Sequence, residues 1–109
     1  RISNAYASDI KFTNTESKGN NRTIKSNTSV NVGNAWIPWC DEKKDFKDHH
    51  MEIQANDFTY YIWQSGDSIR ATKDGWKDNA PSIGGDSSTS QSVYWTLDSD
   101  GTLTQFAEK

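Results

Sequence analysis

The sequence predicts an all-β protein, an antiparallel β-sandwich of about seven short strands in a single domain that spans residues 1–109. Isoleucine, valine, threonine and the aromatic residues far outnumber leucine, methionine and glutamate, which is a composition typical of strands. Short segments in which apolar and polar residues alternate recur about every 8–12 residues, between polar turns, as they do in sandwiches and barrels. Several segments alternate strictly, so each has one face in water, and this favours a sandwich.

The core of this domain is expected to be aromatic and rich in isoleucine. Leucine, isoleucine, valine and phenylalanine make up 17 of the 109 residues, below the roughly 20% at which disorder is suspected. The formal net charge is only −3, however, and the chain has 13 aromatic residues. Large rings bury much area per residue, so we expect a folded domain.

The first half of the chain shows short strands separated by polar turns. Alternation predicts strands at residues 10–13, around Ile24 and at residues 30–32. The apolar stretch at residues 36–40 contains a proline, which fits an edge strand or a bulge. Residues 41–48 are almost all charged and predict a solvated loop or one short helical turn, the only helix we expect.

The next segments predict a hairpin. Residues 51–55 alternate as a half-buried strand, and Asn56-Asp57 has the residue types of a tight turn. Residues 58–63 carry bulky side chains on both faces, which predicts a central strand. Gly66-Asp67 is then expected to turn the chain into a strand at residues 68–72.

The last part of the chain is expected to hold a long loop and a final hairpin. Residues 72–91 have little periodicity, and long loops in compact domains are usually functional. Residues 93–97 and 102–106 are predicted to pair across the turn Asp98-Ser99-Asp100-Gly101. That turn resembles half of a calcium loop, but it lacks the third acidic ligand and the distal glutamate, so a hairpin tip is favoured.

Composition and motifs argue against several classes of function. No basic stripe predicts nucleic acid as a partner, and no apolar run approaches the ~20 residues of a transmembrane segment. Adjacent strand residues point to opposite faces, so His49 and His50 do not predict a metal site. Cys40 has no local group that would activate it as a nucleophile. We therefore expect no enzyme, no metal and no cofactor.

Cys40 is also the only cysteine, so no intrachain disulfide can form. A buried thiol beside Trp39 is favoured over an intermolecular bridge, because free cysteine behaves as a small hydrophobe. The chain begins at Arg1 rather than at a methionine, which leads us to expect a processed N-terminus.

The sequence places one tryptophan where no neighbour is apolar. Trp76 lies in KDGWKD, so its ring must either fold back onto the domain or face a ligand. Sugars stack their C–H faces on such rings and pair their hydroxyls with fixed polar groups. The predicted carbohydrate-binding residues are Trp76, Trp63, Asp67, Arg70 and Asp86. The alternative is that Trp63 belongs to the core, Asp67 to a turn and Arg70 to a solvated strand face.

Three runs carry a resemblance to known proteins: WIPWCD at residues 36–41, YIWQSGDSIR at 61–70 and IGGD at 83–86. Together they resemble small secreted β-sandwich lectins and hemagglutinins of fungi and slime moulds. This resemblance implies a carbohydrate-binding, non-catalytic module with a glycan or glycoconjugate as its ligand, in a secreted or cell-surface location. It assigns no individual residues.

Two alternatives belong to other classes. The aromatic-rich surface is also similar in kind to that of aegerolysins, small fungal proteins that bind membrane lipids. In that case Trp36 and Trp39 would anchor the protein at a lipid surface. The other alternative is a structural domain that binds a partner, in which an exposed edge strand pairs with another copy in a homo-oligomer.

Overall fold

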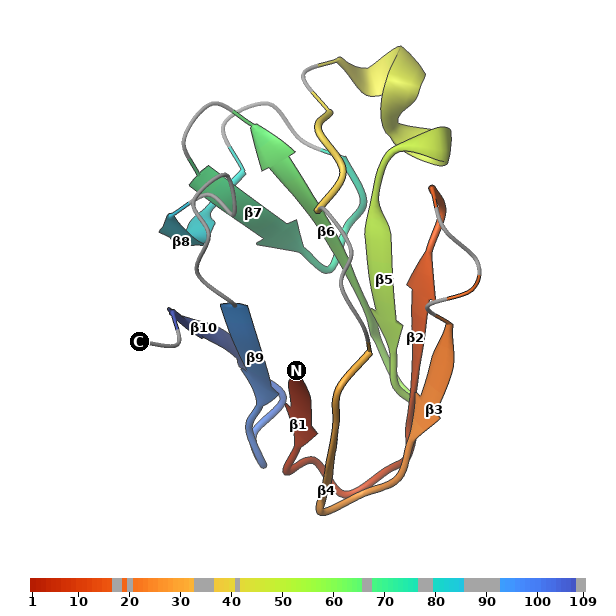
Figure 1. Ribbon diagram of the computed structural model, residues 1–109, viewed down its shortest axis with the longest axis vertical. Helices are drawn as coiled ribbons and strands as arrows, with labels where there is room; N and C mark the ends of the chain where they lie inside the picture. The colour runs from red at the N-terminus through yellow and green to blue at the C-terminus, as the bar shows by residue number, and fades with distance from the viewer. Residues whose placement is uncertain are drawn as a thin grey trace.

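The computed structural model describes residues 1–16, 19, 21–32, 37–40, 42–65, 68–76, 80–85 and 93–107, and within them the chain forms ten strands (Figure 1). They are β1 (Ile2–Asn4), β2 (Ile10–Asn14), β3 (Arg22–Ile24), β4 (Thr28–Val30), β5 (Met51–Gln54), β6 (Thr59–Ser65), β7 (Ser68–Thr72), β8 (Ser82–Gly85), β9 (Val93–Leu97) and β10 (Leu103–Ala107). A short 3-10 helix, η2 (Lys43–Asp48), precedes β5 where the helical turn was predicted. The all-β, single-domain prediction is confirmed, whereas the count of about seven strands is too low.

The strands form two sheets. The four-stranded sheet has the order β10-β9-β1-β4, and the six-stranded sheet has the order β3-β2-β5-β6-β7-β8. Every neighbouring pair is antiparallel except β1 and β9, which are parallel. The purely antiparallel prediction is therefore wrong at this pair. Almost the whole chain separates β1 from β9, so no local sequence pattern reports their direction.

Two strands were not predicted, and both lack a clear apolar alternation. In β1 the side chain of Asn4 is buried, where its Nδ2 donates hydrogen bonds to the carbonyl oxygens of Ser8 and Ile24. Because its amide is hydrogen-bonded, Asn4 can occupy an interior position that an apolar residue would normally fill. The alternation that predicts a strand is therefore missing here. The other strand, β8, lies inside the segment predicted to be a long loop, and it pairs with β7 at the edge of the larger sheet.

The predicted hairpin of β5 and β6 is confirmed. The backbone N–H of Ala55 donates to the carbonyl of Phe58 across the turn, at 2.8 Å. Met51 and Ile53 of β5 are buried while Gln54 is exposed, so the predicted phase of this strand is also correct. As expected from its two apolar faces, β6 is an inner strand, between β5 and β7.

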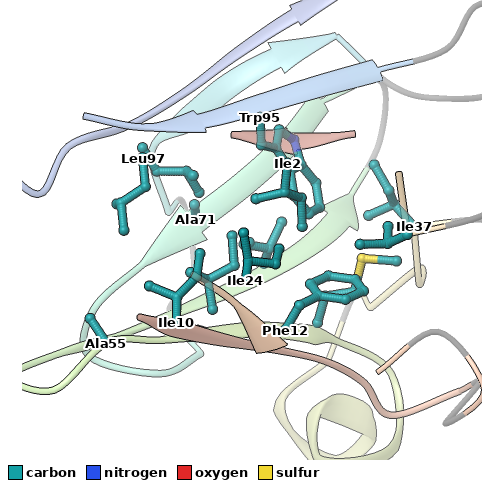
Figure 2. Packing of buried hydrophobic residues seen from close by; sticks show 14 of the residues in the cluster. Ile2, Ile10, Phe12, Ile24, Ile37, Ala55, Ala71, Trp95 and Leu97 are labelled. Atoms are coloured by element: carbon teal, nitrogen blue, oxygen red, sulfur yellow. The ribbon is translucent and has the colours of Figure 1, made fainter. Parts of the chain in front are cut away.

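The main hydrophobic core joins the two sheets (Figure 2). Trp95 and Leu97 of β9 face Ile10 and Phe12 of β2, and the rings of Trp95 and Phe12 lie 6.5 Å apart between centroids. The buried members of this core are Ile2, Ile10, Phe12, Ile24, Val32, Ile37, Met51, Ile53, Ala55, Ile62, Ile69, Ala71, Trp95, Leu97 and Leu103. The predicted aromatic and isoleucine-rich core is confirmed.

We expect Met51→Asp to unfold much of the population, because Met51 is only 3% exposed within the main core. A buried, unpaired carboxylate costs several kcal/mol, which is comparable to the total stability of a small domain. Gln54→Asp is the matched control, since Gln54 is exposed on the same strand. Denaturant melts of the two variants would show this difference, and equal midpoints would contradict the assigned phase of β5.

Candidate functional site

The outward face of the six-stranded sheet carries a second apolar cluster. Buried Cys40, Trp63 and Ala80 form it, and the partly buried rings of Phe46, Tyr61 and Trp76 pack against it. We call these six residues the outer cluster. It exists because side chains alternate along β6: Ile62 points into the main core, so Trp63 must point to the opposite face.

Trp63 lies inside this cluster. Its side chain is 1% exposed, and the ring of Phe46 stands edge-on to it with centroids 5.4 Å apart. A ring covered in this way packs as core, which was the alternative reading of the sequence. It offers no face on which a sugar could stack.

Trp76 folds back onto the domain and packs against the outer cluster, where it remains half-buried. The preceding Gly75 makes this possible because its φ of 93° is one that other residues adopt rarely. The hydroxyl of Thr72 closes the turn by donating to the carbonyl of Gly75. The indole Nε1 of Trp76 is enclosed and has no hydrogen-bond partner in the part of the chain that the structure covers.

Arg70 lies on the same face as Trp63, since the two residues are paired in the register of β6 and β7. One guanidinium nitrogen of Arg70 donates to the carbonyl of Ala80, which ties β7 to a member of the outer cluster. The structure thus brings three of the five predicted site residues, Trp63, Arg70 and Trp76, to one region. Asp67 and Asp86 lie outside the described residues.

His50 attaches η2 to the six-stranded sheet. The residue is 5% exposed, and its ring stacks on the ring of Phe46 with centroids 4.3 Å apart. The Nδ1 atom faces the carbonyl of Phe46 and Nε2 lies 2.8 Å from a carboxylate oxygen of Glu52. These two contacts hold the ring between η2, which carries Phe46, and β5, which carries Glu52. His50 is therefore a structural link.

A third group of aromatic residues comes from the β1–β2 connection and from around the start of β6. The ring of Phe58 is edge-on to Tyr6 and to Tyr60, with centroids 5.2 and 5.6 Å apart. All three rings are half-buried. The ammonium of Lys73 lies over Phe58 and Tyr60, at 4.4 and 5.2 Å from the ring centroids. We call Tyr6, Phe58, Tyr60 and Lys73 the aromatic end.

Hydrogen bonds fix this group to the β9–β10 turn. The hydroxyl of Tyr60 donates to the carbonyl of Gly101 and accepts from the backbone N–H of Leu103. Gly101 has φ of 85°, and a β-carbon there would lie 3.2 Å from the ring of Phe58. The predicted hairpin of β9 and β10 is confirmed by this turn and by the register of the two strands.

Two exposed carboxylates flank the rings. The side chain of Asp57 accepts a hydrogen bond from the hydroxyl of Tyr6 at 2.8 Å, and this bond raises the pKa of the Tyr6 phenol. The backbone N–H of Thr102 donates to Asp100 at 3.0 Å and lowers the pKa of that carboxyl, with a smaller contribution from the nearby charge of Lys73. Both carboxylates are therefore held in place and present negative charge beside the aromatic surface.

Sequence reasoning did not find the aromatic end. Tyr6 lies in a polar stretch, and Phe58 and Tyr60 read as strand residues of an ordinary hairpin. They meet only in space, because Tyr6 follows β1 of the four-stranded sheet whereas Phe58 and Tyr60 lie around the start of β6 in the six-stranded sheet. In the sequence, the glycine of the β9–β10 turn indicates only a hairpin tip and does not identify Phe58 as its neighbour.

The residues of the lipid-binding alternative are only partly described. Trp39 is 46% exposed, while Trp36 lies outside the described residues. Backbone hydrogen bonds from Cys40 to Gln64 and from Gln64 to Pro38 hold the segment around Trp39 against β6. In the described ranges no helix is long and apolar enough to cross a membrane.

The described residues contain no group of three or more histidine, cysteine, aspartate or glutamate side chains that could hold a metal ion. Comparisons of the chain with protein-family models, with curated proteins and with solved structures found no match. The resemblance to fungal and slime-mould lectins therefore rests on the three sequence runs alone.

We expect native alkylation of Cys40 to be slow. Cys40 forms no disulfide within the chain and is only 2% exposed, and its Sγ donates to the carbonyl of Glu42 at 3.3 Å. Labelling with a maleimide, followed by mass spectrometry in the absence and presence of denaturant, would measure this. Equal rates under both conditions would show that Cys40 is accessible in the folded protein.

Trp76→Ala and Trp95→Ala should separate the two kinds of tryptophan. Trp95 is 5% exposed and its Nε1 donates to Gln105 at 2.8 Å, so its loss should cost about 3–5 kcal/mol of stability. Trp76 is half-buried at the outer cluster, so its loss should cost less, about 1–2 kcal/mol, in proportion to the smaller buried area. Denaturant melts would test the order, and a larger loss for Trp76→Ala would contradict it.

Proposed function

We propose that this protein is a non-catalytic carbohydrate-binding module and that its ligand binds at the aromatic end. The observation that supports this proposal is a group of half-buried rings bordered by fixed, exposed carboxylates. Sugars require this combination, since their C–H faces pack on rings and their hydroxyls donate to fixed acceptors.

The carboxylates are suited to this role because they are already oriented. Asp57 is held by the hydroxyl of Tyr6, and Asp100 is held by the backbone of Thr102. Each carboxylate has two oxygens with several acceptor positions, so one bond to the protein leaves others for a ligand. Side chains that are already oriented lose less conformational entropy when a ligand binds.

The position of the aromatic end in the fold also supports the proposal. Its residues come from the β1–β2 connection, the β5–β6 hairpin and the segment after β7, and the β9–β10 turn packs against them. Binding residues are disproportionately found on loops that a rigid scaffold positions. We take that scaffold to be a β-sandwich, and a lectin of this kind would act in a secreted or cell-surface location.

The region around Trp76 and Arg70 is a second candidate surface for the same function. The ring of Trp76 is half-buried, so part of it remains exposed, and it lies near the cluster to which Arg70 is tied. The sequence also predicts Asp67 and Asp86 as binding residues, and both lie outside the described residues.

Binding to a lipid surface is a second candidate function, and the exposure of Trp39 favours it. Tryptophan is enriched at membrane interfaces because its ring is amphipathic. Sedimentation with liposomes would test this function directly, with Trp39→Ala as the variant. Pairing of an edge strand with another copy would instead appear as a dimer in analytical ultracentrifugation.

We expect Phe58→Ala to weaken glycan binding by on the order of 1–3 kcal/mol, as the loss of an aromatic anchor does. Phe46→Ala is the matched control, because Phe46 is also a partly buried phenylalanine but belongs to the outer cluster. A glycan array would identify a ligand, and titration calorimetry with that ligand would compare the variants after melts confirm that both are folded. If Phe58→Ala bound the glycan fully while Trp76→Ala lost binding, the site would instead be the surface around Trp76 and Arg70.

A further inference from the structure

The aromatic end already holds an ammonium group. The Nζ atom of Lys73 lies 4.4 Å from the centroid of Phe58 and 5.2 Å from that of Tyr60. A cation within about 6 Å of a ring centroid is attracted by the negative face of the ring. The structure thus shows a position at which these two rings accept a positive charge.

Lys73 is a replaceable occupant of this position. The residue is exposed, and its ammonium is carried on a flexible four-carbon stem. Contacts between a cation and a ring are weak at exposed sites, because water competes for the cation. The ammonium can therefore return to solvent with little loss when another cation takes its place.

The charge around the rings favours such a cation. The carboxylates of Asp57 and Asp100 are both exposed, and Lys73 is the cation that acts on Asp100. When the ammonium of Lys73 leaves the rings, the negative charge of Asp100 loses the cation that acts on it. A neutral sugar would leave that charge unbalanced, whereas a sugar with a protonated amine would balance it.

We propose that the aromatic end binds a cationic saccharide, that is, a sugar with a free amino group, and that the ammonium of this sugar takes the position of the Lys73 ammonium. This inference rests on the proposed function for the saccharide part of the ligand. The positive charge is inferred separately, from the contacts of Lys73 and from the two carboxylates.

The test uses three probes at a mildly acidic pH: a glucosamine oligosaccharide, its N-acetylated counterpart of equal length, and tetramethylammonium chloride. The two sugars differ in charge while sharing the same ring, and the third probe carries the charge without the sugar. Titration calorimetry should show that the glucosamine oligosaccharide binds more tightly than the acetylated one. Its affinity should fall as salt rises, because the attraction between exposed charges is screened.

Lys73→Met removes the ammonium, which is the internal competitor, while keeping a flexible apolar stem. It should bind the glucosamine oligosaccharide about two- to fivefold more tightly than the parent, which is the range set by an exposed contact between a cation and a ring. Lys44→Met is the matched control, since Lys44 is an exposed lysine on η2, paired with Glu42. It should bind as the parent does.

Asp57→Asn and Asp100→Asn should each weaken that binding and reduce its dependence on salt. The new amide oxygens can still accept the hydrogen bonds from Tyr6 and Thr102, so the turns should keep their geometry. Thermal melts of all the variants would confirm that they are folded.

The outcomes separate the two proposals. Equal binding of the charged and acetylated sugars, unchanged in Lys73→Met, overturns the inference of a cationic ligand and leaves the proposed function standing. If tetramethylammonium binds but neither sugar binds, and no glycan on the array binds, the proposed function is overturned. The rings then still provide a site for a cation. Binding of none of the three probes by the parent and by Lys73→Met overturns the inference of a cationic ligand.

Discussion

The architecture depends on one strand, β6, which buries large side chains on both of its faces. Ile62 is fully buried in the main core, and Trp63, its neighbour, is 1% exposed on the opposite face. A single pair of packed sheets would leave Trp63 in water. Burial of its indole therefore requires further chain on the outward face, and η2 and the segments around Cys40 and Ala80 supply it. At β6 the protein therefore has three layers: the two sheets and the segments that cover the outward face of the larger sheet.

The outer cluster and the aromatic end are covered in different ways. Backbone hydrogen bonds between Cys40, Gln64 and Pro38 hold the cover of the outer cluster in place, and the pair of His50 and Glu52 adds a link from η2. Opening this cover would expose a tryptophan and break several hydrogen bonds. At the aromatic end, by contrast, the exposed side chain of Lys73 lies over the rings of Phe58 and Tyr60, and moving it aside breaks none of these backbone bonds. The aromatic surface that is easiest to open is therefore the one at the aromatic end.

The sequence predicts those parts of the fold in which local pattern and burial agree. Strand β5 and the final hairpin alternate clearly, β6 carries bulky residues on both faces, and each strand lies close to where these patterns place it. The two strands that were not predicted, β1 and β8, form because of contacts with distant segments rather than because of their own apolar pattern. Asn4 occupies an interior position because its amide is fully hydrogen-bonded, and β8 contains serine and two glycines at a sheet edge. The parallel pairing of β1 with β9 joins the two ends of the chain, which no local pattern can report.

The candidate site is harder to predict because contacts between distant segments decide it. Trp76 stands out in the sequence because its neighbours are mostly charged, but the turn at Gly75 brings its ring back to the outer cluster. The aromatic end shows the opposite case. Its residues look like ordinary strand and loop residues in the sequence, but in the structure they form a group that packs against the β9–β10 turn. Gly101 permits that approach, because a β-carbon would press on Phe58. The same turn holds Asp100 through the hydrogen bond from Thr102. It also places this carboxylate near enough to Lys73 for the lysine charge to add to the lowering of the Asp100 pKa. One glycine thus couples the packing of the rings to the placement of the charge beside them.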